Sequence, residues 1–182
     1  MSTQAEIVES LQCVNRPGIE DLLKFLGKSD YFQAPASTKF HGAYKGGLAI
    51  HSMDVAKLLK EKNDRYKLGL SMESIMLCGL LHDACKINYY AIGPKGYVVK
   101  DDFPIGHGEK SVIVIQRFIE LTDEEIAMIR WHMNAWDTSL HTDYPNGYAF
   151  RAAVRKWPAI VALYTADYEA TSFVHDKRRL GV

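Results

Sequence analysis

The 182-residue chain is 47% hydrophobic and 24% charged, a composition typical of a globular domain with a hydrophobic core and not of a disordered chain. Its 22 lysines and arginines balance 22 aspartates and glutamates, so no overall positive field exists to hold a long nucleic acid. A small or short anionic partner fits this balance better.

Apolar spacing and capping residues predict mostly helices. Thr122 and Glu125, for example, have the spacing of a capping box that starts a helix. The stretch YYAIGPKGYVVK, residues 89–100, alternates about a Gly-Pro-Lys-Gly turn and predicts a small β-hairpin. In chain order, the expected helices cover residues 3–14, 18–26, 48–61, 71 to the LLHDACK motif, 108–120, 122–132, 148–156 and 158–173.

No repeat, low-complexity segment or linker interrupts this pattern, so we expect residues 1–182 to form a single all-α domain, a helical bundle with one hairpin excursion. The start of the chain does not resemble a signal peptide, and no apolar run reaches the roughly 18 residues of a membrane span. We therefore expect a cytoplasmic protein with no membrane partner.

The cysteines at positions 13, 78 and 85 are odd in number, widely spaced and without a CxxC pair. This pattern argues against a disulfide framework and against a cysteine zinc site. We interpret all three as small buried residues in a reducing compartment.

Histidines and carboxylates recur where the pattern predicts burial. His51 shares a helix face with Leu48 and Val55 and therefore points inward, while His82 and Asp83 follow an apolar helix. Each of these residues alone is more commonly a hydrogen-bonded core or helix-end residue than a ligand. Their desolvation is nevertheless costly unless a partner compensates it.

Asp167, in LYTADYEA, lies among small and apolar neighbours, where an unpaired carboxylate would be strongly destabilising. A partner cation is therefore expected. Imidazoles and carboxylates together suit first-row divalent ions, and ligands from separate helices can close around one ion inside a bundle. The order His51, His82–Asp83, Asp167 supplies such a set.

The segments FHGAYKGGLAIHS, LLHDACK, GHGEKS, IRWHM and TADYEA, spread over residues 40–170, resemble the successive motifs of the HD-domain metal-dependent phosphohydrolases. The resemblance implies a first metal ion held by His51, His82, Asp83 and Asp167. In the two-metal branch, Asp83 bridges to a second ion, and His107 and His132 match that ion's other ligands. Two divalent ions per chain are thus expected, from among Mn, Mg, Fe, Co, Ni and Zn.

Lys86, three residues after Asp83, also matches the two-metal branch, and the closest resemblance is to phosphodiesterase-like members that include 3′-5′ exoribonucleases. Their segment HHAxxGGLxxHT is near HGAYKGGLAIHS, but Gly42 stands where the second histidine would be. The chain also has no room for the extra nucleic-acid-binding domain of those enzymes. Processive RNA degradation is therefore not expected.

The resemblance implies a phosphohydrolase that cleaves a nucleotide, short oligonucleotide or other short phosphodiester with metal-activated hydroxide, with Asp83 and Lys86 as catalytic residues. Lys86 and Lys110 would offset charge on the phosphoryl oxygens. His41 either contacts a phosphate or faces solvent. Trp136, with Tyr144 and Tyr148, either stacks on a base or pins its own loop to the core. The alternative function is a nucleotide sensor on the same scaffold with little or no turnover.

Overall fold

The computed structural model describes residues 2–133 and 146–174, and within these ranges the chain is mostly helical with one small antiparallel sheet. The predicted all-α class with a hairpin excursion is therefore confirmed. The elements are α1 (Thr3–Gln12), α2 (Ile19–Lys28), α3 (Gly47–Tyr66), α4 (Met72–Leu81), the 3₁₀ turn η1 (Ala84–Lys86), β1 (Tyr90–Gly93), β2 (Gly96–Val99), α5 (His107–Gln116), α6 (Asp123–Trp131), α7 (Asn146–Lys156), α8 (Ala159–Glu169) and the π-helical turn η4 (Ala170–Val174).

Helix starts agree with the sequence prediction more closely than helix ends. Ser71 caps α4, and the predicted capping box of α6 is present, with reciprocal hydrogen bonds between Thr122 and Glu125. By contrast, α3 was predicted to end near 61 and continues to Tyr66, and α5 was predicted to end near 120 and stops at Gln116. N-caps are set by local side chains, whereas the length of a helix also depends on what packs against it.

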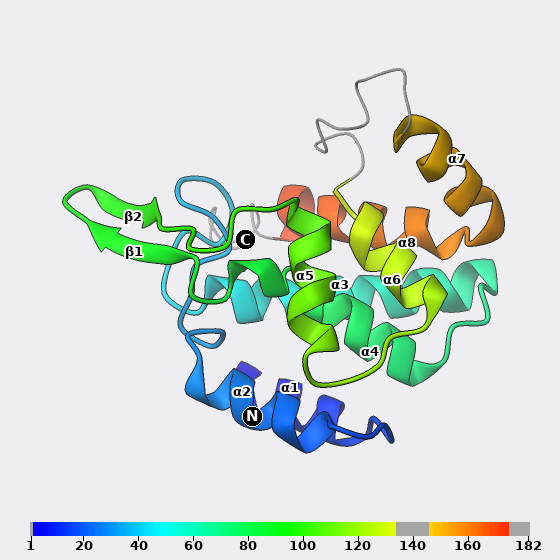
Figure 1. The fold of residues 1–182 in the computed structure, drawn as a ribbon, viewed down its shortest axis with the longest axis horizontal. Coiled ribbons are helices and arrows are strands. Elements are labelled where there is room, and N and C mark those ends of the chain that lie inside the picture. The colour runs from blue at the N-terminus through cyan, green and yellow to red at the C-terminus, as the bar shows by residue number, and fades with distance from the viewer. Residues whose placement is uncertain (1, 134–145, 175–182) are drawn as a thin grey trace.

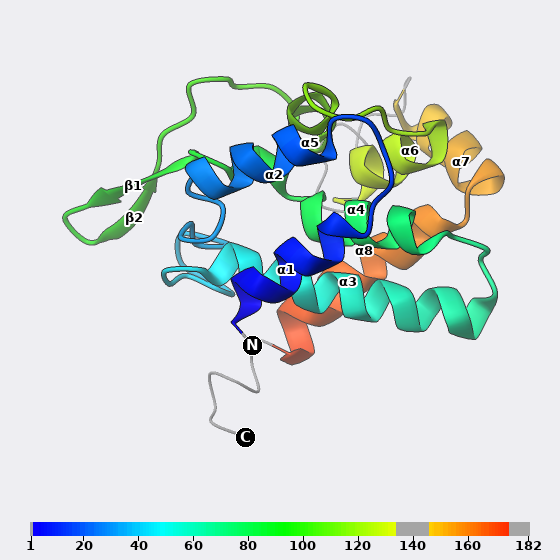
Figure 2. The ribbon, with the colours of Figure 1, turned by 90° about the horizontal axis from the view of Figure 1, so that it is seen from below.

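Helix α3 is central to the bundle and packs against α1, α4 and α8 (Figures 1 and 2). Helices α5 and α6 pack against each other, and α6 also contacts α4 and α8. The buried apolar side chains form one connected core, which includes Leu11, Val55, Leu80, Ile129 and Leu163. Among the residues that the structure describes, none of the helices combines the length and apolar character that a membrane crossing needs.

Two glycines allow helices to approach closely beside the histidines. A Cβ atom on Gly79 would lie 2.5 Å from the Cα of Ala56, so α4 lies directly against α3. A Cβ atom on Gly108 would lie 2.2 Å from the carbonyl oxygen of Arg130, so the first turn of α5 lies against the end of α6. These two contacts join α3 to α4 and α5 to α6, the two pairs of helices that carry the histidines or end at them.

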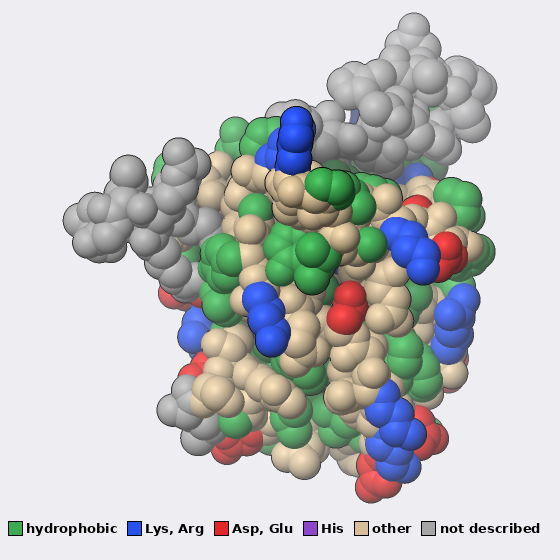
Figure 3. Space-filling model, turned by 90° about the vertical axis from the view of Figure 1, so that its left-hand side faces the viewer, with side chains coloured by type: hydrophobic (Ala, Val, Ile, Leu, Met, Phe, Trp, Pro, Cys, Tyr) green, Lys and Arg blue, Asp and Glu red, His purple; other side chains and the backbone are tan. Residues whose placement is uncertain are grey.

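The hairpin β1–β2 extends from one end of the bundle (Figure 1), with Tyr90 paired to Val99 and Gly93 to Gly96. Hydrophobic side chains are exposed on this end of the molecule (Figure 3). Ile92 is 88% exposed and Val99 54% exposed. The hairpin therefore adds little to the core.

Candidate metal centre

Three side chains from three helices meet in the interior. His51 lies in the first half of α3, His82 caps the C-terminus of α4, and Asp167 lies near the end of α8. The Nε2 atom of His51 is 3.0 Å from Asp167 Oδ1 and 3.3 Å from His82 Nε2. We call these residues the first ligand group.

Hydrogen bonds to the main chain fix the orientation of two imidazoles. His82 Nδ1 lies 2.9 Å from the carbonyl oxygen of Gly79, and His132 Nδ1 lies 2.6 Å from that of Ile129. A carbonyl oxygen can only accept, so in both rings Nδ1 carries the proton and Nε2 presents its lone pair to the centre. This arrangement is typical of histidines that bind metal ions.

Asp83 lies between two sets of histidines, with one carboxylate oxygen directed at each. Oδ2 is 3.6 Å from His82 Nε2 and 3.8 Å from His51 Nε2. Oδ1 is 2.7 Å from His107 Nε2 and 3.7 Å from His132 Nε2. A carboxylate placed in this way can contact two ions at once.

Asp83 also forms a second cluster with Cys85 and His107, which we call the second ligand group. His107 is the first residue of α5, and its Nε2 atom is 3.3 Å from Cys85 Sγ. The sequence analysis expected Cys85 to be buried, which the structure confirms, but it did not place this residue among the candidate ligands. The same expectation is wrong for Cys13, which is exposed.

Ser111 forms hydrogen bonds to both segments that carry the second ligand group, η1 and the start of α5. The Ser111 hydroxyl accepts a hydrogen bond from the backbone N–H of Cys85 at 3.1 Å and donates to the His107 carbonyl at 3.3 Å. No sequence signal pairs residue 85 with residue 107, since η1 and α5 are separated by the hairpin. The position of Cys85 two residues after Asp83 is the one available hint.

The charged groups of the centre shift one another's pKa values. Burial alone would raise the pKa of Asp83, but the positive charge of Lys86 and the neighbouring imidazoles outweigh burial and hold that pKa well below its usual value. Burial also opposes ionisation of Asp167, yet the hydrogen bond from His51 lowers the pKa of that carboxyl. Both carboxylates are therefore negatively charged near neutral pH.

Burial also favours the uncharged forms of the histidine and thiol donors, and for these groups it outweighs the neighbouring charges. It lowers the pKa of His82 to about 4, aided by His132 and His51 and opposed by Asp83. Burial raises the pKa of the Cys85 thiol to about 12, and the charge of Asp83 acts in the same direction. At neutral pH His82 is therefore an unprotonated donor, as a metal ligand must be.

Lys86 forms an ion pair with Asp83 of the centre, whereas Lys110 forms its ion pair with Asp101. The ammonium group of Lys86 is 2.6 Å from Asp83 Oδ2, and its charge pairing with Asp83 outweighs burial and raises the pKa of Lys86. Lys110 Nζ instead pairs with Asp101 Oδ1 at 2.5 Å and lies 5.0 Å from the centre of the Tyr89 ring. Of the two lysines, Lys86 is therefore the one paired directly with a predicted metal ligand.

His41 lies beside the first ligand group, with its ring centre 5.0 Å from that of His51. Burial, with the charges of His51 and Lys86, lowers the pKa of His41 to about 3. Its neighbour Gly42 has a φ of 59°, and a Cβ atom there would lie 2.7 Å from that of Ala36. This loop therefore requires glycine at 42, where the related segment has a histidine. Trp136 lies outside the described residues.

The donors match the requirements of divalent ions. Ligand atoms bound to one ion at about 2.0–2.2 Å lie roughly 3 Å apart, as the Nε2 and Oδ1 atoms of His51 and Asp167 do. His132 Nε2 is buried and has no hydrogen-bond partner among the described residues. A buried lone pair without a donor is costly, and an ion in this position would satisfy it.

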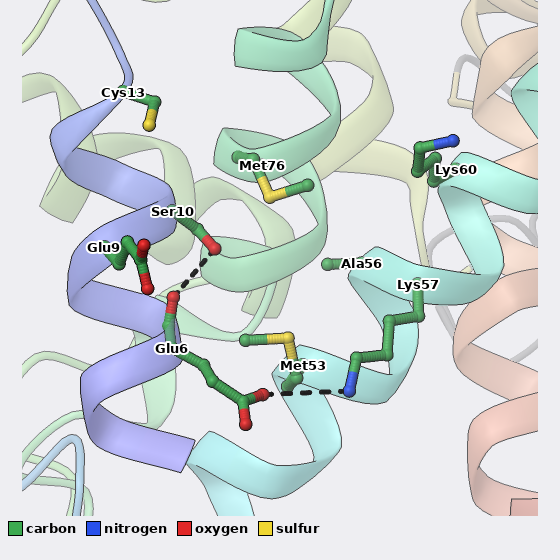
Figure 4. A pocket seen from close by; sticks show the side chains of 9 residues that line it. All are labelled: Glu6, Glu9, Ser10, Cys13, Met53, Ala56, Lys57, Lys60 and Met76. Carbon is green, nitrogen blue, oxygen red and sulfur yellow. Dashed lines mark hydrogen bonds and ion pairs between the residues drawn. The ribbon is translucent and has the colours of Figure 1, made fainter. Parts of the chain in front are cut away.

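A separate pocket lies between α1, α3 and α4 and is lined in part by Met53, Ala56 and Met76 (Figure 4). Glu6 in α1 forms an ion pair with Lys57 in α3 across its edge, at 3.8 Å. None of the predicted ligands lines this pocket, so it is distinct from the metal centre.

Comparison with known families supports this interpretation of the centre. A search of curated proteins and a search of solved structures each found no similar chain. The family model described as "HD domain" matches residues 48–169, a range that contains every predicted metal ligand and most of the chain. The chain therefore belongs to the HD-domain family, whose members are generally metal-dependent hydrolases.

Proposed function

We propose that this chain is a two-metal phosphohydrolase that cleaves a phosphoester bond of a nucleotide or a short phosphodiester. One observation carries the proposal: the two oxygens of Asp83 are directed at different histidine pairs, Oδ2 at His51 and His82 and Oδ1 at His107 and His132. This is the arrangement that a bridging carboxylate needs. Membership of the HD-domain family supports the same reaction class.

In this proposal, His51, His82, Asp83 and Asp167 hold the first ion, and Asp83, His107 and His132 hold the second. Two divalent ions would lower the pKa of bound water from about 15.7 toward about 7 and offset charge on the phosphoryl oxygens. Asp83 fixes the two positions relative to each other. The main-chain hydrogen bonds of His82 and His132 keep both imidazoles aimed at the centre.

Lys86 is the proposed contact to the substrate phosphate. Its ammonium group is buried beside Asp83, where it carries positive charge at neutral pH and has protons to donate to a phosphoryl oxygen. His41 is a second proposed contact, because its ring adjoins that of His51. Lys110 and Trp136 are proposed as further contacts to the substrate.

The proposal is tested by measuring released phosphate and nucleoside monophosphate. The purified protein is stripped of metal, reconstituted with Mn, Mg, Fe, Co, Ni or Zn, and offered nucleoside phosphates, cyclic nucleotides and short oligonucleotides. We expect metal-dependent turnover of at least one class, lost on chelation. The Asp83→Ala variant should be inactive, and the control Asp64→Ala, which removes an exposed carboxylate of α3, should match the wild type.

A nucleotide sensor would give a different result. It would bind one of the nucleotides in the presence of metal without releasing product under any metal. That outcome would show that the function of this scaffold is nucleotide binding and not hydrolysis.

A further inference from the structure

We infer that Cys85 is a thiolate ligand of the second ion, and that the second position therefore prefers Zn²⁺, Fe²⁺ or Co²⁺ to Mg²⁺ or Mn²⁺. The inference rests on the proposed two-metal site and adds a ligand and a metal class to it. It starts from the second ligand group, in which Asp83, Cys85 and His107 each offer one donor atom and all three atoms lie within 4.8 Å of one another.

The geometry brings the sulfur to the same side of Asp83 as His107. Cys85 Sγ is 3.3 Å from His107 Nε2, which is 2.7 Å from Asp83 Oδ1. Cys85 is only 4% exposed, so its sulfur faces the centre and not solvent. Ser111 holds the backbone of Cys85 and the carbonyl of His107 in place from α5.

His132 supplies an independent observation at the same position. Its Nε2 atom is fully buried, lies 3.7 Å from Asp83 Oδ1, and finds no hydrogen-bond partner within the described part of the chain. The centres of the His107 and His132 rings are 5.2 Å apart. Asp83 Oδ1 therefore faces the nitrogens of both imidazoles, and the sulfur of Cys85 adjoins the nitrogen of His107.

This donor set differs from that of the first ligand group, which contains only nitrogen and oxygen. Thiolate selects borderline and soft ions, whereas Mg²⁺ and Mn²⁺ favour oxygen ligands. When the sulfur binds the ion, its S–H bond breaks, the proton passes to solvent, and the electron pair left on sulfur forms the bond to the metal. No change of oxidation state is involved.

The test uses cobalt as a spectroscopic probe in the 182-residue chain. The exposed Cys13 is first changed to Ser, so that it cannot bind cobalt on the surface. Metal-free protein is titrated with two equivalents of Co²⁺, and the near-ultraviolet thiolate-to-cobalt band is recorded. We expect one such band per chain, present also in the control Cys78→Ala and absent in Cys85→Ala, which should keep the visible bands of cobalt bound to the first ligand group.

A second measurement needs no variant at position 85. X-ray absorption of the zinc-loaded parent should show sulfur at about 2.3 Å in addition to nitrogen and oxygen.

In competition experiments, Cys85→Ala should lower the preference of the second position for Zn²⁺ over Mn²⁺ on the order of tenfold. A parent that binds two ions without a sulfur signal by either method would overturn the inference.

The results separate this inference from the proposed function. Hydrolysis by a two-ion enzyme without metal–sulfur bonding would leave the function intact and remove Cys85 from the ligand set. A cobalt–thiolate band without hydrolysis of any substrate in the panel would keep the ligand and reject the function.

Discussion

The two ligand groups are built in different ways. The first group, His51, His82 and Asp167, lies on three helices that form the middle of the core, and both histidines are fully buried. The second group lies on a short 3₁₀ turn and on the first residue of α5, and the His107 side chain is 31% exposed. The first site is thus part of the folding core, whereas the second depends on how two element ends are held together.

This difference has an energetic consequence. Residues of the first group cannot move without disturbing α3, α4 and α8, so that site is preorganised by the packing of the core. The second group can be lost locally, because helix ends and short turns open more readily than core helices. We therefore expect the ion at the second position to exchange faster and to be removed first by a chelator.

Asp83→Ala should have the largest effect, because Asp83 belongs to both halves of the centre. We expect loss of both ions from the purified, folded protein and loss of activity to the background. Elemental analysis and the phosphate-release assay measure the two effects. Full metal content together with normal turnover in this variant would rule out a bridging role for Asp83.

The double variant His107→Ala, His132→Ala should separate the two groups. We expect it to bind one ion per chain where the wild type binds two, and to lose most of its activity, while its first ligand group is unchanged. Elemental analysis after gel filtration gives the count. If the wild type is fully active with a single ion, or the double variant is as active as its parent, the second site does not contribute to catalysis.

Lys86→Met should lower the rate without removing metal, because in the proposed mechanism the ammonium group acts on the phosphate and not on the ions. A loss of about 10²-fold in kcat is expected, as for removal of one donor to a developing oxyanion. Lys24→Met, which removes an exposed lysine of α2, is the control and should change nothing. A fall in metal content equal to that of Asp83→Ala would show that Lys86 instead supports the ions.

The metal-free protein should lose stability as the pH falls from 6.5 toward 4. The pKa of His82 is about 4 in the folded chain against about 6.5 when unfolded, so in this window the unfolded state binds a proton that the native state does not. Stability is therefore complete above pH 6.5 and declines below it, by about 3 kcal/mol at pH 4 from His82 alone.

Urea denaturation of the chelated protein at pH 7, 6, 5 and 4 measures this effect. Burial also lowers the pKa of His41, so His41 adds to this loss of stability at low pH. For His132, the interaction with Asp83 outweighs burial and raises the pKa, so His132 changes stability only above pH 6.5. The loss of stability with falling pH should be smaller in the variant His82→Asn. A stability that is constant over this range would show that His82 is not held neutral.

Much of the centre was predictable because local chemistry marks its residues. His51, His82, Asp83 and Asp167 stand on apolar helix faces or at helix ends, where a polar group needs a partner, and the structure brings all four together. Helix starts were predictable for a similar reason: the side chains of Ser71 and Thr122 form their capping bonds within three residues.

Other features of the centre depend on contacts that composition and spacing do not encode. Cys85 was interpreted as a packing residue, and its sulfur meets His107 because Ser111 joins η1 to α5. The placement of Lys110 beside Asp101 likewise depends on the loop after the hairpin.

The sequence by itself determined the helical class, the positions of the caps and the buried polar residues that are expected to need a partner, because each follows from periodicity or from the cost of burying a polar group. The tertiary structure alone decided which donor atoms share a space. The two oxygens of Asp83 are directed at different histidine pairs because Gly79 lets α4 approach α3 and Gly108 lets α5 approach α6. Such distances between remote segments are set by helix packing and not by spacing along the chain.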